Sequence, residues 1–200
     1  GLGSRGAGTT VTSGDLCAAE ACFRPPCAVY VEKQVRCLDT CSDAELNLAD
    51  GWRCDKACSG DLNKCCDVNA DCDGVQTCDQ QPTLEVAPGA CLGYRIRITN
   101  ISTTGVSLPG PLTVNDLMSN QGVFQSGPSS VMLPTGWVCP NFNWNGTDVT
   151  CTLPGADPLD PGESATIKFK SELKDPAQMD AMFPGAIPDP VNTVTVNGSS

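Results

Sequence analysis

The chain contains no histidine, and this absence removes most familiar catalytic arrangements. A Ser-His-Asp or Cys-His nucleophile needs an imidazole base, and lysine-based alternatives show no local signature. A c-type haem is excluded as well, because its attachment motif, Cys-x-x-Cys-His, ends in histidine. Aromatic residues make up only 5% of the chain, so few aromatic side chains are present to line a sugar-binding cleft. We therefore expect that the protein is not an enzyme.

Two further absences restrict the partners. No apolar run approaches the roughly 20 residues that a membrane-spanning helix needs, so we expect no membrane span. The net charge is −11, whereas nucleic-acid binding requires a basic surface, so we expect no nucleic-acid partner.

The chain starts at Gly1 rather than at methionine, which suggests that a signal or leader segment has been removed or that an expression scar remains.

Cysteine, in contrast, is abundant. Cytosolic proteins keep thiols reduced or bound to metal, whereas a secreted protein turns an even number of cysteines into disulfides. No Cys-x-x-Cys pair occurs, which disfavours zinc, iron–sulfur and thioredoxin-like redox sites. We expect all 14 cysteines to pair into seven disulfides, an extracellular or cell-surface location, and no cofactor. The cysteines are Cys17, Cys22, Cys27, Cys37, Cys41, Cys54, Cys58, Cys65, Cys66, Cys72, Cys78, Cys91, Cys139 and Cys151.

The distribution of cysteines, glycines and apolar residues divides the chain into four parts. Residues 1–16 form a glycine-rich N-terminal extension, and residues 17–36 form a linker followed by a first strand. Residues 37–81 form a cysteine-rich insertion. It begins with a capping-box pattern, Ser42-Asp-Ala-Glu45, which predicts a short helix ending near Gly51. The rest of the insertion reads as disulfide-linked loops, and residues 82–200 form a β-rich domain.

Short segments that alternate apolar and polar residues, separated by Gly, Pro and Asn turns, predict an all-β protein built as a sandwich. Alternation gives each strand one buried face, so Tyr94, Ile96 and Ile98 should point inward while Arg95 and Arg97 face water. The predicted strands are 28–36, 83–86, 92–99, 112–115, 148–153, 164–170 and 191–196.

The β-rich domain contains six sequence motifs in a characteristic order: EVAPGACLGYRIRITN (85–100), LTVNDL (112–117), LPTGWVC (133–139), DVTCTL (148–153), LDPGESATI (159–167) and VNTVTV (191–196). Together they resemble the DUF11 family of immunoglobulin-like repeat domains over about residues 82–198, with an opening strand near 28–36. The resemblance implies an immunoglobulin-like β-sandwich at a prokaryotic cell surface, without catalytic residues, and a disulfide between Cys139 and Cys151. The insertion and the N-terminal extension depart from the family pattern, so we expect what is particular to this protein to reside there.

The insertion carries one candidate metal site. Asp67, Asn69, Asp71, Asp73 and Asp79 surround a sequence similar to the calcium loop D-x-[DN]-x-[DN]-G, where alternate side chains converge on the ion. The first position is asparagine and the twelfth is not glutamate, which argues against an EF-hand. The alternative is a polar turn shaped by disulfides alone.

Three sequons, at Asn100, Asn145 and Asn197, are candidate glycosylation sites. Patterns of three residues also arise by chance, and this alternative stays open.

The N-terminal extension holds a run of β-forming residues, Thr9, Thr10, Val11, Thr12 and Ser13, inside a glycine-rich stretch. Such a segment can complete the open sheet edge of a neighbouring copy, or it can fold back on its own domain. Exchange between copies is head-to-tail and builds open filaments. We therefore predict a structural subunit of an extracellular, pilus-like filament. The alternative is a monomeric surface adhesin or envelope binding module that uses the insertion to bind a ligand.

Overall fold

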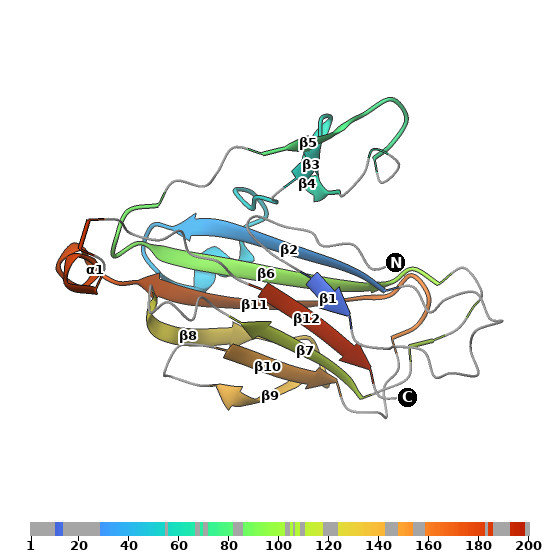
Figure 1. Cartoon of the computed structure of the whole chain (residues 1–200). Coiled ribbons are helices and arrows are strands. Elements are labelled where there is room, and N and C mark those ends of the chain that lie inside the picture. The colour runs from blue at the N-terminus through green and yellow to red at the C-terminus, as the bar shows by residue number, and fades with distance from the viewer. Residues whose placement is uncertain are drawn as a thin grey trace.

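The structure, a computed structural model, describes residues 11–13, 29–54, 56–66, 69, 72–81, 86–102, 105, 107–108, 111–117, 124–142, 148–153, 159–182, 184–185 and 193–198. Within these ranges the fold is mostly β, as the alternation predicts, with strands in three sheets (Figure 1). No helix in the described ranges is long and apolar enough to cross a membrane.

The first large sheet has four strands in the order β2-β6-β11-β8, and all neighbours are antiparallel. Its two longest pairings follow the predicted alternation, since Val31 lies opposite Ile98, and Ile96 lies opposite Ile167. The strands are β2 (Val29–Leu38), β6 (Cys91–Asn100), β11 (Ser164–Leu173) and β8 (Phe124–Met132).

The second large sheet has five strands in the order β1-β12-β7-β10-β9. Strands β12, β7, β10 and β9 are antiparallel to their neighbours, whereas β1 runs parallel to β12. The strands are β1 (Val11–Ser13), β12 (Thr193–Gly198), β7 (Leu112–Leu117), β10 (Asp148–Leu153) and β9 (Val138–Phe142).

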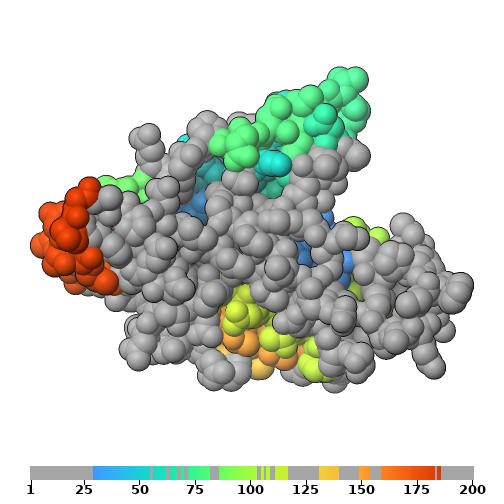
Figure 2. Space-filling model, viewed as in Figure 1, coloured from blue at the N-terminus to red at the C-terminus, as the bar shows by residue number. Residues whose placement is uncertain are grey.

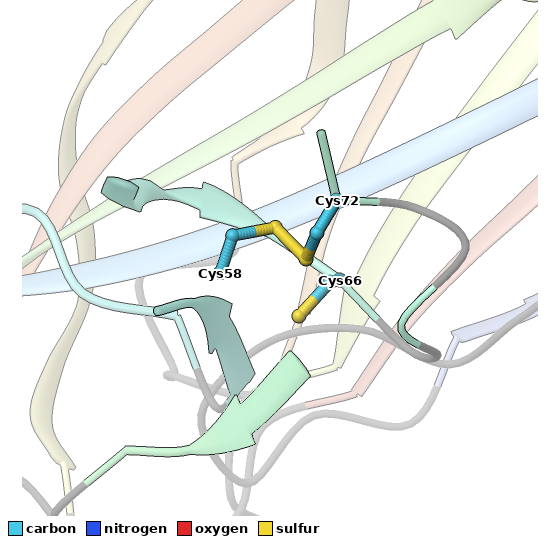
Figure 3. A group of neighbouring side chains, drawn as sticks. All are labelled: Cys58, Cys66 and Cys72. Carbon is cyan, nitrogen blue, oxygen red and sulfur yellow. A yellow bond between two sulfur atoms is a disulfide. The ribbon is translucent and has the colours of Figure 1, made fainter. Parts of the chain in front are cut away.

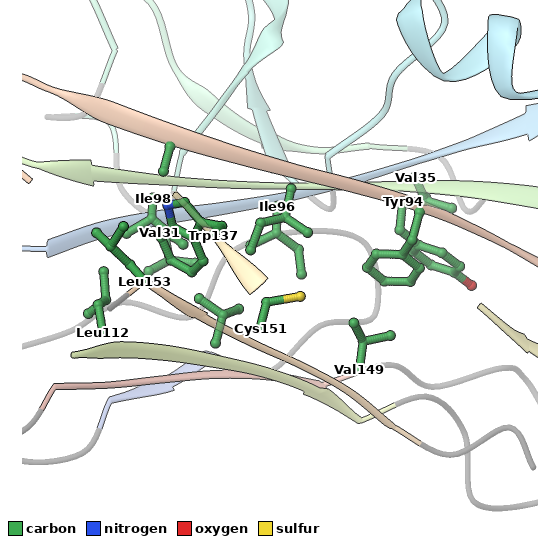
Figure 4. Close-up of a cluster of buried hydrophobic side chains, with 14 of the residues drawn as sticks. Val31, Val35, Tyr94, Ile96, Ile98, Leu112, Trp137, Val149, Cys151 and Leu153 are labelled. Carbon is green, nitrogen blue, oxygen red and sulfur yellow. The ribbon is translucent and has the colours of Figure 1, made fainter. Parts of the chain in front are cut away.

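The inward faces of the two large sheets share one hydrophobic core. Figure 4 shows side chains of the first sheet, among them Ile96 and Ile98, pointing toward those of the second sheet, such as Val149. Tyr94 stacks on Phe169 with ring centroids 5.1 Å apart. The predicted inward residues of β6 are confirmed, because Tyr94, Ile96 and Ile98 are buried. Arg97 is exposed as predicted, whereas Arg95 is half-buried because Trp52 covers it. We call this pair of sheets the two-layer body.

The insertion contains a small third sheet, in the order β4-β3-β5. This corrects the expectation of loops alone: strands of three to five residues carry too short an alternation to be seen in sequence. They are β3 (Lys56–Cys58), β4 (Asp61–Cys65) and β5 (Cys78–Gln80). The sheet lies on the outer side of β2 (Figure 1), and Figure 2 shows the insertion projecting from the surface.

The base of the insertion covers the outer face of β2 and β6. The capping box predicted at Ser42 is present and begins a 3-10 helix, η2 (Asp43–Asn47), whose Leu46 is fully buried. This contact needs glycine at position 93 of β6, because a Cβ there would lie 2.9 Å from the Leu46 side chain. Trp52 is also buried here, and the guanidinium of Arg95 lies 4.8 Å from its ring centroid.

Three described elements outside the insertion, β8, β9 and α1, were not predicted from sequence, and one prediction cannot be compared. Strand β8 contains Gly127 and Pro128, which interrupt alternation, and an edge position tolerates the proline. Helix α1 (Pro176–Met182) begins with its own reciprocal cap, because Asp175 and Gln178 each accept the other's backbone N–H. The predicted strand 83–86 lies outside the described residues except for Val86.

Candidate functional site

The segment of the N-terminal extension that the structure describes is paired with the C-terminal strand. Val11, Thr12 and Ser13 form β1 at one end of the five-stranded sheet, in parallel register with β12. Val11 lies opposite Val194, and Thr12 lies opposite Thr195. Thr9 and Thr10, which belong to the same predicted segment, lie outside the described residues. In the single chain, therefore, the described part of the extension pairs with its own domain.

Strand β12 lies between β7 and β1 in the five-stranded sheet. On one side β12 pairs with β7 over six residues, and on the other side its described partner is β1. An unpaired strand edge offers a row of N–H and C=O groups to any extended segment. We call the β12 side that faces β1 the β12 edge. In this structure the strand at the β12 edge comes from the same chain.

Five disulfides lie among the described residues, and four of them belong to the insertion and its base. They join Cys41 to Cys91, Cys54 to Cys65, Cys58 to Cys72, Cys66 to Cys78, and Cys139 to Cys151. The Cys139–Cys151 bridge is the pair that the DUF11 resemblance implies, and it links β9 to β10. The Cys41–Cys91 bridge joins a residue near the start of the insertion to the strand that follows it. The chain is thus disulfide-rich, which is compatible with an extracellular protein.

Three cysteines of the insertion bring their sulfur atoms within 4.8 Å of one another: Cys58, Cys66 and Cys72. Such a group can resemble a metal site. However, the sulfurs of Cys58 and Cys72 are bonded to each other (Figure 3), and Cys66 is bonded to Cys78. Since a disulfide sulfur is not a thiolate, the group is accounted for by disulfides.

Cys37 has no disulfide partner among the described residues. Cys17, Cys22 and Cys27 lie outside them. The five observed bridges use ten cysteines, and the remaining four are an even number. The expected total of seven disulfides therefore stays a prediction.

The residues of the candidate calcium loop are only partly described. Asn69 Oδ1 accepts the backbone N–H of Cys78 at 2.8 Å. Asp73 forms an ion pair with Lys64 at 2.9 Å, and Asp79 accepts the hydroxyl of Thr77. Asp67 and Asp71 lie outside the described residues. The three described side chains thus contact protein groups, and calcium binding stays a prediction.

The sequon at Asn100 lies in the interior of the protein. The Asn100 side chain is 0% exposed, its amide donates to the carbonyl of Leu159, and its oxygen accepts the N–H of Ser102. A glycan on this nitrogen is incompatible with the packing, which corrects the expectation for Asn100. Asn145 lies outside the described residues, and Asn197 is described only by its backbone, in β12.

A buried ion pair connects the two large sheets. Lys33 of β2 places Nζ 2.6 Å and 2.7 Å from the two carboxylate oxygens of Asp116 in β7. The two side chains are only 2% and 0% exposed. The ring of Tyr94 lies beside the pair, with its centroid 5.2 Å from Nζ.

Burial lowers the pKa of the Lys33 ammonium to about 8, although the charge and hydrogen bonds of Asp116 act to raise it. The desolvation of a buried ion pair is costly, so such a pair is weak evidence for a purely stabilising role.

Sequence reasoning did not single out this pair, yet each strand carries a signal for it. Inward positions of β2 are Val29, Val31, Lys33 and Val35, and those of β7 are Leu112, Val114 and Asp116. In each strand one charged residue stands at an apolar position of the alternation. Two such exceptions of opposite charge in neighbouring sheets predict a buried pair.

Comparison of the chain with models of protein families finds no match, and neither does comparison with curated proteins.

Proposed function

We propose that this protein is the structural subunit of an extracellular, pilus-like filament, joined head-to-tail through exchange of strand β1. In this arrangement β1 of one subunit occupies the β12 edge of the next. The observation that carries the proposal is the position of β1 at the end of the five-stranded sheet, where β12 is its one partner among the described residues. Exchange would replace each contact within a chain by the same contact between chains.

The length of chain next to β1 supports this exchange. Residues 14–28 separate β1 from β2, and 15 residues can span up to about 50 Å when extended. This reach exceeds the size of a small domain, so β1 can arrive at a neighbour's β12 edge while β2 stays in its own sheet. When each subunit gives its strand to one neighbour and accepts a strand from another, the contact is head-to-tail and can repeat into an open filament.

We also propose that the two-layer body is an immunoglobulin-like sandwich of the DUF11 kind. The two sheets with a common core, the order of the motifs, and the Cys139–Cys151 bridge support this assignment. A non-enzymatic role outside the cell, without a cofactor, fits both the absence of histidine and the number of disulfides.

Engineered cysteines can test whether the strand is exchanged. Thr12 and Thr195 lie opposite each other in the parallel register. In the double variant Thr12→Cys, Thr195→Cys, a disulfide within one chain gives monomers on a non-reducing denaturing gel. A disulfide between chains gives a ladder of covalent oligomers. We expect the ladder in assembled material, and each single variant serves as the control that should not produce it.

A second test removes the strand. Deletion of residues 1–13 should leave a folded monomer, and Thr12→Pro should weaken assembly because proline cannot donate to the ladder, whereas Thr12→Val should be tolerated. Electron microscopy of the full-length and variant proteins gives the readout. Filaments formed by the deletion variant, or covalent monomers from the double-cysteine variant in filaments, would contradict strand exchange.

The projecting insertion favours a second candidate function, that of a monomeric surface adhesin or binding module. The insertion extends away from the two-layer body (Figure 2), and its Val75 side chain is fully exposed. This candidate predicts that the full-length chain stays monodisperse at concentrations where the filament subunit assembles. Light scattering over a concentration series separates the two.

A further inference from the structure

The Lys33–Asp116 contact places an amine and a carboxyl group together in a site shielded from water. Both carboxylate oxygens lie within 2.7 Å of Nζ, and both side chains are almost completely buried. The two residues are 83 positions apart in sequence and belong to different sheets. A covalent bond between them would therefore join the two layers of the body.

The two distances also locate the amine relative to the carboxyl carbon. Because the C–O bonds of a carboxylate are only about 1.2 Å long, an atom this close to both oxygens lies no more than about 3 Å from the carbon between them. A separation of about 3 Å between reacting atoms is typical of a near-attack arrangement, in which fixed geometry replaces a high concentration of free reactant. Lys33 Nζ is within reach of Asp116 Cγ.

Burial makes the uncharged form of the amine easier to reach. Burial lowers the pKa of Lys33 to about 8, so the ammonium gives up its proton more readily than an exposed lysine does. Transfer of that proton to the Asp116 carboxylate leaves a neutral amine beside a neutral carboxylic acid. This form avoids two charges in an apolar core, and its nitrogen carries the lone pair that a nucleophile needs.

The geometry points to an amide bond between Lys33 Nζ and Asp116 Cγ, formed within the folded chain. The nitrogen lone pair attacks Cγ, a proton moves from the nitrogen to the departing hydroxyl group, the C–O bond breaks, and one water molecule leaves. No oxidant, reductant or further reactant is consumed. The amide is uncharged, and the released water passes to the solvent, so burial favours the amide over its hydrolysis. This crosslink does not depend on the filament proposal.

The mass of the intact chain tests the crosslink. The full-length protein is folded with its disulfides intact, incubated, then reduced, denatured and weighed by mass spectrometry. We expect a mass lower than that of the reduced sequence by one water molecule. In a tryptic digest, cleavage after Lys33 should be lost, and the peptide that contains Lys33 should be joined to the one that contains Asp116.

The residues that lose the water molecule must be identified, because Asp50 and Asp73 each precede glycine and can also lose water by forming a cyclic imide. A loss mapped to either of these residues, or a folded wild-type chain that keeps its full mass after incubation, would overturn the proposal and leave an ordinary ion pair. Lys33→Arg is the matched control: it keeps the positive charge, lacks the amine, and should show the full mass. The wild-type measurement decides even if this variant does not fold.

Discussion

Removing one disulfide of the insertion should loosen the insertion and leave the two-layer body nearly unchanged. Among the residues of the small sheet whose side chains the structure describes, the buried positions are almost all half-cystines, since the two apolar clusters contain only Ala57 besides cysteines. The insertion, residues 37–81, is 45 residues long, and a segment of this size rarely buries enough apolar surface to fold without disulfides. The insertion is therefore held mainly by its bridges.

The loop-entropy relation gives the size of the effect. The Cys58–Cys72 bridge closes a loop with a sequence separation of 14, and the Cys139–Cys151 bridge of the body closes one of 12. Loops of this length each contribute about 3 kcal/mol to the free energy of unfolding. The two bridges are thus a matched pair: equal in expected magnitude, but located in different parts of the molecule.

Hydrogen exchange resolved by peptide measures both parts at once. In Cys58→Ala, Cys72→Ala, amides of β3 and β4 should exchange on the order of a hundredfold faster, while those of β6 and β11 keep their protection. In Cys139→Ala, Cys151→Ala, the body should lose about 3 kcal/mol of stability against denaturant. Equal destabilisation of β6 and β11 by the first pair would refute the reasoning, because insertion and body would then unfold as one unit.

Three further predictions concern single residues. Ile98→Ala should lower the free energy of unfolding by about 2–5 kcal/mol, because it leaves a cavity at a fully buried site. Arg97→Ala, on the outer face of the same strand, should lower it by less than about 1 kcal/mol. Urea denaturation measures both variants, and equal effects would contradict the assigned faces. Asn100→Ala should lower the free energy of unfolding by about 1–3 kcal/mol, since it removes the hydrogen bonds to the carbonyl of Leu159 and from the N–H of Ser102. Glycopeptide mapping of secreted wild-type protein should find Asn100 unmodified. The hydrogen bond from the backbone N–H of Ser42 is the main reason that the pKa of Glu45 is lowered to about 2. Because the ordinary pKa of this carboxyl group is 4.5, the Glu45 carboxylate stabilises the folded state fully above pH 4.5, and this stabilisation is lost as the pH falls toward 2. Amide protection around Ser42 should follow this loss, and Glu45→Gln should abolish the pH dependence between those values.

Alternation alone was sufficient to predict the central strands of the body. In β6, β10 and β11, mostly apolar residues occupy every second position, and a strand with one buried face requires this pattern. Strand β8 could not be predicted in this way, because its Gly127 and Pro128 are tolerated by an edge position that only the complete sheet reveals.

The position of the insertion could be predicted from sequence, but its disulfide connectivity and its sheet could not. Cysteine density marks its limits, whereas the connectivity of its bridges depends on which strands meet in space. The buried ion pair was missed for a different reason. Lys33 and Asp116 each look like ordinary polar members of alternating strands, and only the parity of their positions places both side chains inward.

The two proposals meet in one row of residues across the second sheet. In the register of the strands, Val11 of β1 lies opposite Val194 of β12, and Val194 lies opposite Asp116 of β7. Tension applied to an exchanged β1 would therefore pass through β12 to the position of β7 at which Asp116 meets Lys33 of β2. Hydrogen bonds between strands can separate one after another under load, whereas an amide bond at this point would transfer the load directly to the first sheet. If both proposals hold, single filaments of Lys33→Arg subunits should assemble normally, because β1 and the β12 edge are unchanged, but should extend at lower force than wild-type filaments. Equal extension forces would separate the crosslink from any mechanical role while leaving its chemistry to the mass measurement.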